Sequence, residues 1–197
     1  MNVVTVERGP YPDMIEQILA GAERAFLASG FDLATMESVA RHSGVARASV
    51  YNNFRNKEAL FLAVMQRGVT EFVARATTQI IDDLPPSERL RQAAITFLHV
   101  ATEREATEMY RTVVAQSVRF PELSRTLHNQ GLMRIESAFR TLADDAGIVD
   151  PAGFAEQLLA ALMGGYFSKC LLGATPDESP EAFVGRALRI LLPSLVA

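Results

Sequence analysis

The chain has 197 residues, of which 49% are hydrophobic and 21% charged, a composition typical of one or two packed domains rather than a disordered polymer. Its formal net charge of -4 argues against a protein that coats nucleic acid or anionic membrane indiscriminately. The single cysteine, Cys170, excludes an intramolecular disulfide framework, and no long apolar segment predicts a membrane span. We therefore expect a soluble, cytosolic protein that makes no contact with a membrane.

The first predicted helix begins near Asp13. Asp13 and Glu16 have the spacing of a capping box, and Gly30 can end the helix in the left-handed conformation. Between them, apolar residues recur at the spacing of one helix face, at Ile15, Ile18, Leu19, Ala22, Ala25 and Phe26. We expect residues 1–12 to form a flexible arm ahead of this helix.

Two short helices follow. Thr35 is a suitable N-cap for a helix over residues 36–43, because its hydroxyl can accept a hydrogen bond from the first turn. Gly44 can then reverse the chain, since glycine adopts a positive φ without steric cost. The third helix is predicted over residues 46–54.

The rest of the chain continues in helical periodicity. Asn56 is the predicted N-cap of a long helix over residues 57–81. The later predicted helices, several with proline in the first turn, are residues 87–103, 106–119, 121–146, 151–172 and 180–195. No segment alternates with the period of two that predicts a strand. The predicted fold class is therefore all-α, with about nine helices.

Residues 38–57 have the properties of a helix-turn-helix. Ala40 is small enough for two helices to cross closely, Gly44 suits the turn, and Val50 can anchor the second helix. An ordinary pair of packed helices would explain the same three residues. The segment also contains no acidic residue and four basic ones, Arg41, Arg47, Arg55 and Lys57. The phosphates of a nucleic acid would therefore meet no negative side chain of this segment.

A family resemblance rests on the motifs FDLATM (31–36), GVARASVYNNF (44–54) and NKEALF (56–61). In this order they resemble the N-terminal DNA-binding domain of the TetR family of transcriptional regulators, over residues 15–64. The sequence from RFPEL (119–123) onward is similar to one ligand-binding subtype of C-terminal domain in that family.

The resemblance implies that the start of the third helix approaches base edges in the major groove, through Arg47, Ala48 and Ser49. Helical geometry adds Asn52, which points away from a core that contains Val50. An arginine at this position can reach guanine, and an alanine can contact a thymine methyl.

The resemblance also implies contacts with the sugar-phosphate backbone, from Thr35, Tyr51, Asn53 and Lys57. Such contacts fix the register of a protein on DNA rather than its sequence preference. Two of these residues have a purely structural alternative. Tyr51 could pack between helices, and Thr35 could serve as a cap and nothing more.

The predicted domains are an N-terminal arm (1–12), a helix-turn-helix domain (13–56) and a ligand-binding and dimerisation domain (57–197), with the helix over 57–81 as the link. The family architecture implies an apolar ligand pocket lined by Phe97, Met109, Tyr110, Val113, Phe139, Met163, Tyr166 and Phe167. It implies a dimer interface that includes Leu158, Leu162, Gly165, Phe183, Leu188 and Leu191. Ordinary packing within one chain is the alternative for each of these residues.

The resemblance thus implies a homodimeric, ligand-responsive bacterial repressor that binds double-stranded DNA at a palindromic operator and is released by a small, mostly apolar effector. We expect no cofactor and no bound metal. A helical enzyme using Cys170 is a distant alternative, because the chain lacks a nucleophile elbow, a phosphate loop and an HExxH pair. A closer alternative is a helical small-molecule-binding protein that no longer reads DNA.

Overall fold

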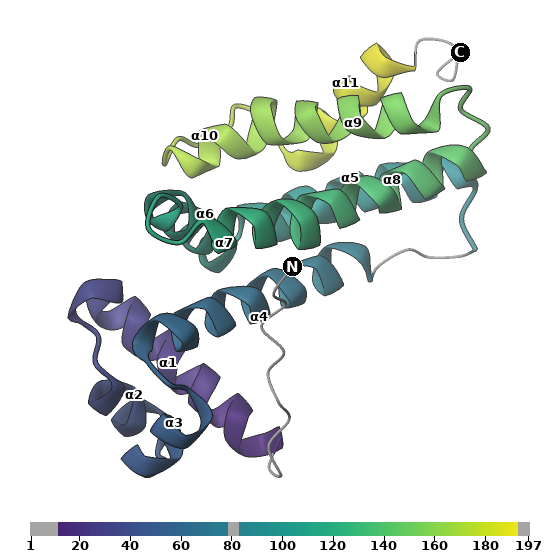
Figure 1. The fold of residues 1–197 in the computed structure, drawn as a ribbon. Coiled ribbons are helices and arrows are strands. Elements are labelled where there is room, and N and C mark those ends of the chain that lie inside the picture. The colour runs from purple at the N-terminus through teal and green to yellow at the C-terminus, as the bar shows by residue number, and fades with distance from the viewer. Residues whose placement is uncertain (1–11, 79–82, 193–197) are drawn as a thin grey trace. The chain divides into compact units, whose positions relative to one another are not determined.

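The computed structural model describes residues 12–78 and 83–192, without the side chains of residues 12 and 13. Over these residues the chain forms nine continuous helices and no strand (Figure 1). The fold class predicted from the sequence is confirmed. The chain divides into two compact units, the first ending at Arg67 and the second beginning at Gly68. None of the helices in the described ranges is long and apolar enough to cross a membrane.

The first unit contains α1 (Pro12–Leu33), α2 (Met36–Ser43), α3 (Arg47–Asn53) and the beginning of α4 (Lys57–Thr77). Its core combines completely buried aliphatic side chains with three phenylalanine rings. Phe26 and Phe31 from α1 meet Phe61 from α4, with ring centroids 5.1 Å and 4.7 Å from that of Phe61. This cluster holds both ends of the unit's sequence together around α2 and α3.

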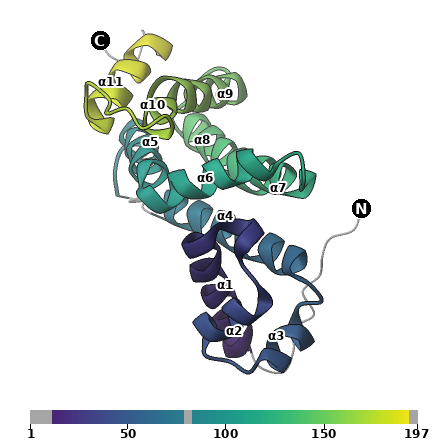
Figure 2. The ribbon, with the colours of Figure 1, turned by 90° about the vertical axis from the view of Figure 1, so that its left-hand side faces the viewer.

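Helix α1 packs against α2 (Figure 2) at a point where there is no room for a side chain on α1. A Cβ atom on Gly21 would lie 2.4 Å from Cβ of Ser43 and 2.5 Å from its Cα. The two backbones therefore approach each other directly, and only glycine fits at this position. The apolar periodicity of α1 does not reveal this contact.

Gly30 interrupts α1 where the sequence predicts the end of the helix, with φ 73° and ψ 169°. A short turn resumes beyond it, because the N–H of Ala34 donates to the carbonyl oxygen of Gly30 at 3.2 Å. Of the arm predicted over residues 1–12, residues 1–11 lie outside the described residues, and Pro12 is the first residue of α1. The capping prediction for Asp13 lies outside the described side chains. The predicted helix extensions over residues 79–81 and 193–195 also lie outside the described residues.

The second unit is a helical bundle around α5 (Pro86–Thr102). Besides the end of α4 it contains α6 (Arg104–Gln116), α7 (Pro121–Thr126), α8 (Met133–Asp145), α9 (Pro151–Ala161), α10 (Ser168–Leu171) and α11 (Pro180–Leu191). Helix α5 packs against α8, α11 and α6, and α8 packs against α9. Phe97 and Leu98 of α5 are completely buried at the centre of this bundle.

Two of the long helices in this unit contain a π-helical turn. The π-segment η1 (Leu127–Leu132) joins α7 to α8, and η2 (Leu162–Phe167) joins α9 to α10. Figure 1 shows both runs as unbroken ribbons. Isolated π turns inside α-helices are rare, and they occur frequently at functional sites.

Candidate nucleic-acid interface and apolar hollow

The turn between α2 and α3 is built from local chemistry that the sequence predicts. The hydroxyl of Thr35 accepts a hydrogen bond from the Ser38 N–H, and the Ser38 hydroxyl accepts one from the Thr35 N–H, both at 3.1 Å. This capping box fixes the start of α2. Gly44 ends the helix with φ 70°, and its N–H donates to the carbonyl oxygen of Ala40 at 3.0 Å. The predicted N-cap and turn glycine are confirmed.

Helix α3 is anchored on one side and exposed on the other. Val50 is completely buried, and Phe54, just after the helix, is 5% exposed. The four side chains predicted to approach base edges lie on the remaining surface: Arg47, Ala48 and Asn52 are exposed, and Ser49 is half-buried. The structure therefore leaves the start of this helix open to a partner.

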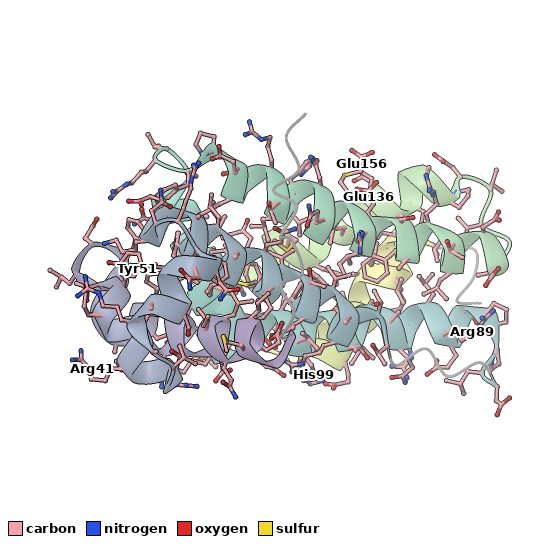
Figure 3. All side chains as sticks on the ribbon, turned by 60° about the horizontal axis from the view of Figure 1, so that its bottom comes forward. Arg41, Tyr51, Arg89, His99, Glu136 and Glu156 are labelled. Carbon is pink, nitrogen blue, oxygen red and sulfur yellow. The ribbon has the colours of Figure 1, made fainter. Side chains whose placement is uncertain are left out.

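Arg47 is held by two residues of the same unit. Its Nη2 lies 2.5 Å from Oε1 of Glu37 on α2, and its guanidinium carbon lies 5.3 Å from the ring centroid of Tyr51. The Tyr51 hydroxyl donates to the same Glu37 oxygen at 3.5 Å, a long hydrogen bond. Tyr51, labelled in Figure 3, is 42% exposed, so it is not a core residue. Glu37 is a member of this site that the sequence analysis missed.

The remaining residues predicted to contact the DNA backbone also have partners within the chain. Lys57 Nζ donates to the carbonyl oxygens of Phe31 and Asp32 at 2.7 Å and 3.0 Å, and so caps the end of α1. Asn53 Nδ2 donates to the carbonyl oxygen of Ser49 at 2.8 Å. Asn56 caps α4 as predicted, since its Oδ1 accepts from the Ala59 N–H at 2.8 Å. These contacts fix side-chain positions but leave Asn53 exposed.

The second unit contains an apolar hollow. The side chains that line it come from α4, α5, α6 and the two π-segments: Phe72, Phe97, Ala101, Ala106, Met109, Tyr110, Leu127, Leu132, Met163 and Phe167. None of them carries a charge. The volume of the hollow is about 20 Å³. One water molecule needs roughly 10–15 Å³. The hollow is therefore narrow as it stands.

Five of the predicted pocket residues line this hollow: Phe97, Met109, Tyr110, Met163 and Phe167. The other three are buried elsewhere. Val113 and Phe139 are each 2% exposed and lie in the packed interior. The hydroxyl of Tyr166 donates to the carbonyl oxygen of Glu178 at 3.2 Å, and its ring stacks edge-on against that of Phe183.

The residues predicted for a dimer interface differ in how much surface they offer. Leu158 and Leu162 are completely buried within the single chain, and Phe183 is 7% exposed. Leu188 and Leu191 on α11 are partly buried. A helix that is apolar all round is buried on more than one side, but its sequence does not say which side faces its own bundle.

Each of the two units matches a family model of bacterial transcriptional regulators. Residues 18–64 match the family model of bacterial regulatory proteins of the tetR family. Residues 88–193 match the model of the AefR-like transcriptional repressor C-terminal domain. The two matches have the same order as the two compact units of the structure.

Two relatives that are named as transcriptional repressors align with most of the chain. The transcriptional repressor AcnR of Corynebacterium diphtheriae is 26% identical over 169 residues, which are 83% of this chain and 84% of the relative. The repressor BepR of Brucella suis is 25% identical, with 80% of both chains covered. Both relatives are helix-turn-helix repressors.

Solved structures show the same fold. A TetR-family regulator from Mesorhizobium loti superimposes with a TM-score of 0.78 at 22% identity, covering 91% of this chain and 95% of its own. The flavonoid-responsive regulator FrrA gives a TM-score of 0.71 at 25% identity, with 92% and 96% covered.

Proposed function

Because the chain belongs to the TetR family of bacterial regulatory proteins, with an AefR-like C-terminal domain, we propose that it is a repressor that binds a palindromic operator as a homodimer and is released by a small apolar effector. The observation that carries this proposal is the open start of α3, where the side chain of Arg47 is 63% exposed. A protein that reads chromosomal DNA works in the bacterial cytoplasm, which is the location we propose.

In this proposal, α3 enters the major groove and its first turn reads bases. The fork of Arg47 can donate to O6 and N7 of one guanine, the commonest specific contact between proteins and DNA. Ala48 meets a thymine methyl group, while Ser49 and Asn52 offer groups that donate and accept hydrogen bonds. Two copies of α3 occupy successive major grooves about 34 Å apart, which requires a symmetric site.

The residues around this helix fix its register on the duplex. The hydroxyl of Thr35 accepts within the capping box, and its own hydrogen can donate to a phosphate. Lys57 Nζ uses two donors on backbone carbonyls, and a lysine has three. Tyr51 and Asn53 belong to α3 itself, and both side chains are exposed. Contacts of this kind carry no sequence information by themselves.

The apolar hollow is the proposed effector site. Its walls supply aromatic rings and two methionine side chains, so a neutral, largely apolar molecule suits it. Because the hollow is narrow, such a molecule enters only if side chains move, and methionine adapts most readily. Phe72 lines the hollow from α4, the helix whose first part, from Lys57 to Arg67, belongs to the DNA-binding unit. An effector can release DNA only through a difference in its affinity for the two states of the protein.

The homodimer is proposed to form through α11 and the outward side of α9 and η2. Ile190 on α11 is 67% exposed, an unusual position for a large aliphatic side chain, with Leu188 and Leu191 partly exposed beside it. Gly164, in η2, has no other atom within 4 Å of the place of a Cβ, so a partner helix can approach closely there. Leu158 and Leu162 then support this surface from beneath.

The experiment that tests the proposal is selection of bound duplexes from a random pool, followed by competition with a panel of neutral apolar compounds. We expect a palindromic sequence whose binding weakens steeply with salt and is lost with at least one compound. Failure to enrich any sequence, together with binding that is independent of salt, would contradict DNA reading. It would favour a helical protein that binds a small molecule and no longer reads DNA.

A further inference from the structure

Glu37 has a position in the fold that its sequence neighbours do not suggest. Residues 38–57 contain no acidic side chain, and Glu37 lies one residue before that segment. The crossing of α2 and α3 nevertheless brings its carboxylate onto the first residue of α3, with 2.5 Å between Glu37 Oε1 and Arg47 Nη2. Arg41 and Arg55, the other arginines of the segment, form no ion pair with any residue in the described ranges.

The three side chains form a small connected group, which we call the Glu37 cluster: Glu37, Arg47 and Tyr51. One carboxylate oxygen accepts a hydrogen bond from Tyr51 and forms the ion pair with Arg47, and the guanidinium of Arg47 lies over the Tyr51 ring. Tyr51 therefore supports the arginine from one side while Glu37 holds it from another. The guanidinium has five N–H donors, and only part of its fork faces the carboxylate.

Folding stability does not explain this cluster. The side chains of Arg47 and Glu37 are 63% and 46% exposed, and ion pairs this exposed contribute little to stability. The carboxylate is nevertheless ionised at neutral pH. Hydrogen bonding to its own backbone N–H is the largest cause that lowers the pKa of Glu37 below its ordinary value of 4.5; burial opposes it, and the charge of Arg47 adds to the lowering.

We infer that Glu37 is a positioning residue for Arg47, and that it increases the preference of the protein for its operator over other DNA. The inference rests on the proposed function. With one edge of the guanidinium fixed by Glu37 and the ring below it, the other edge is already oriented for bidentate contact with a guanine. Less conformational freedom is then lost when the operator binds.

The same ion pair makes random DNA a poorer ligand. Non-specific binding comes from lysine and arginine side chains that replace the counterions of phosphates. An arginine whose charge is balanced by a carboxylate contributes less to that exchange. A free arginine in the same place would contact any backbone phosphate within reach of its flexible stem. Glu37 therefore favours binding to the operator and also weakens binding to random DNA.

The test is Glu37→Gln, which keeps the shape of the side chain and removes its charge. Dissociation constants are measured for the selected operator and for a random duplex, each over a series of salt concentrations. We expect random DNA to bind more tightly, with a salt slope steeper by about 0.9. We expect operator binding to gain less or to weaken, so that the ratio of the two affinities falls about tenfold, or by 1.4 kcal/mol.

Two further variants make the result specific. Glu136→Gln makes the same change in net charge on α8, where Glu136 is partly exposed (Figure 3), and is expected to leave the affinity ratio unchanged. In an Arg47→Ala background, Glu37→Gln is expected to have no further effect on the ratio, because a positioning residue acts through the group that it positions.

The outcomes separate this inference from the proposed function. If no duplex is selected, the proposed function fails. If Arg47→Ala alters operator binding but Glu37→Gln leaves the ratio unchanged, the role of Glu37 is overturned and the proposed function stands. An effect of Glu37→Gln that persists without Arg47 would mean that Glu37 contacts DNA directly, which also overturns the inference. If Glu37→Gln shifts the affinity for both DNAs equally and Glu136→Gln gives the same shift, the effect is one of net charge and the inference is overturned.

Discussion

The ring of Phe183 occupies the space that a side chain on Gly165 would need. A Cβ atom at position 165 would lie 2.6 Å from Cζ of Phe183, within the same chain. The glycine in η2 therefore allows α11 to pack against its own bundle. The sequence could not distinguish this use of a glycine from close approach by a partner chain.

Gly165→Leu is expected to destabilise the fold, because it displaces the Phe183 ring from a packed position. Overpacking of this kind costs about 1–3 kcal/mol. Ala115→Leu is the matched control, since Ala115 is exposed on α6, and it should keep the free energy of unfolding within about 0.5 kcal/mol of the parent. Denaturant unfolding of both variants gives the comparison. Equal stability of Gly165→Leu and the parent would show that Phe183 moves away freely.

Arg47→Ala is expected to cost about 1–3 kcal/mol of operator binding and to relax the preference at one base pair in each half-site. The reason is the loss of a bidentate contact that only one base can provide. Binding to a set of operators with single substitutions measures both effects. A uniform loss across all of these sequences would assign Arg47 to the phosphate backbone instead.

Lys57→Ala is expected to weaken binding to all sequences alike and to reduce the salt slope by about 1. Lys57 also caps α1 through the carbonyl oxygens of Phe31 and Asp32, so thermal unfolding is measured in parallel. Lys57→Arg keeps the charge and separates the two roles. A change in base preference with Lys57→Ala, at unchanged stability, would contradict a contact that only fixes register.

Ala106→Leu is expected to weaken effector binding, because the larger side chain fills space in a hollow that is already narrow. A clash of about 1–3 kcal/mol corresponds to roughly a 5- to 150-fold loss of affinity. Operator binding without effector should change little. Ala152→Leu, at an exposed position on α9, is the control for a leucine added elsewhere. Unchanged effector affinity in Ala106→Leu would place the effector outside this hollow.

Acid is expected to remove part of the stability of the second unit through Glu88. Hydrogen bonds from Arg91 and Gln92 lower the pKa of the Glu88 carboxyl from 4.5 to about 2. Because the folded state has the lower pKa, the contribution is complete above pH 4.5 and is lost as the pH falls towards 2. The side chain is 33% exposed, which limits the effect to under about 1 kcal/mol.

Glu88→Gln removes this titration, so its stability should fall less than that of the parent between pH 5 and 2. Glu136→Gln is the control, since Glu136 forms no ion pair with the described residues. Melting curves across this pH range provide the measurement. Parallel pH profiles for the parent and Glu88→Gln would show that the pair contributes nothing.

The sequence predicts those features of the fold that depend on local chemistry. The cap at Thr35, the turn at Gly44 and the cap at Asn56 all form as expected, because each depends on a side chain and a few neighbouring backbone groups. The π turns in η1 and η2 were not predicted. A single turn with one extra residue changes the apolar periodicity too little to be read from the sequence.

The parts of the site that the sequence missed depend on how helices cross. Glu37 meets Arg47 across ten residues of sequence, and no periodicity relates the two. Phe72 lines the hollow although the helix over 57–81 was interpreted as a link between domains. Leu158 was expected to face a partner and is completely buried in its own chain. Apolar character indicates that a residue is buried, but not against what.

The direct backbone contact between α1 and α2 at Gly21 has a consequence for how this protein could be re-engineered. Because backbone meets Ser43 directly at this point, the spacing of the two helices there does not depend on the side chains of the outer surface. Residues 47–49 and 52 are exposed or half-buried and can be exchanged as a set. New operator preferences are thus accessible by grafting a few outward-facing side chains, without redesign of the scaffold that presents them.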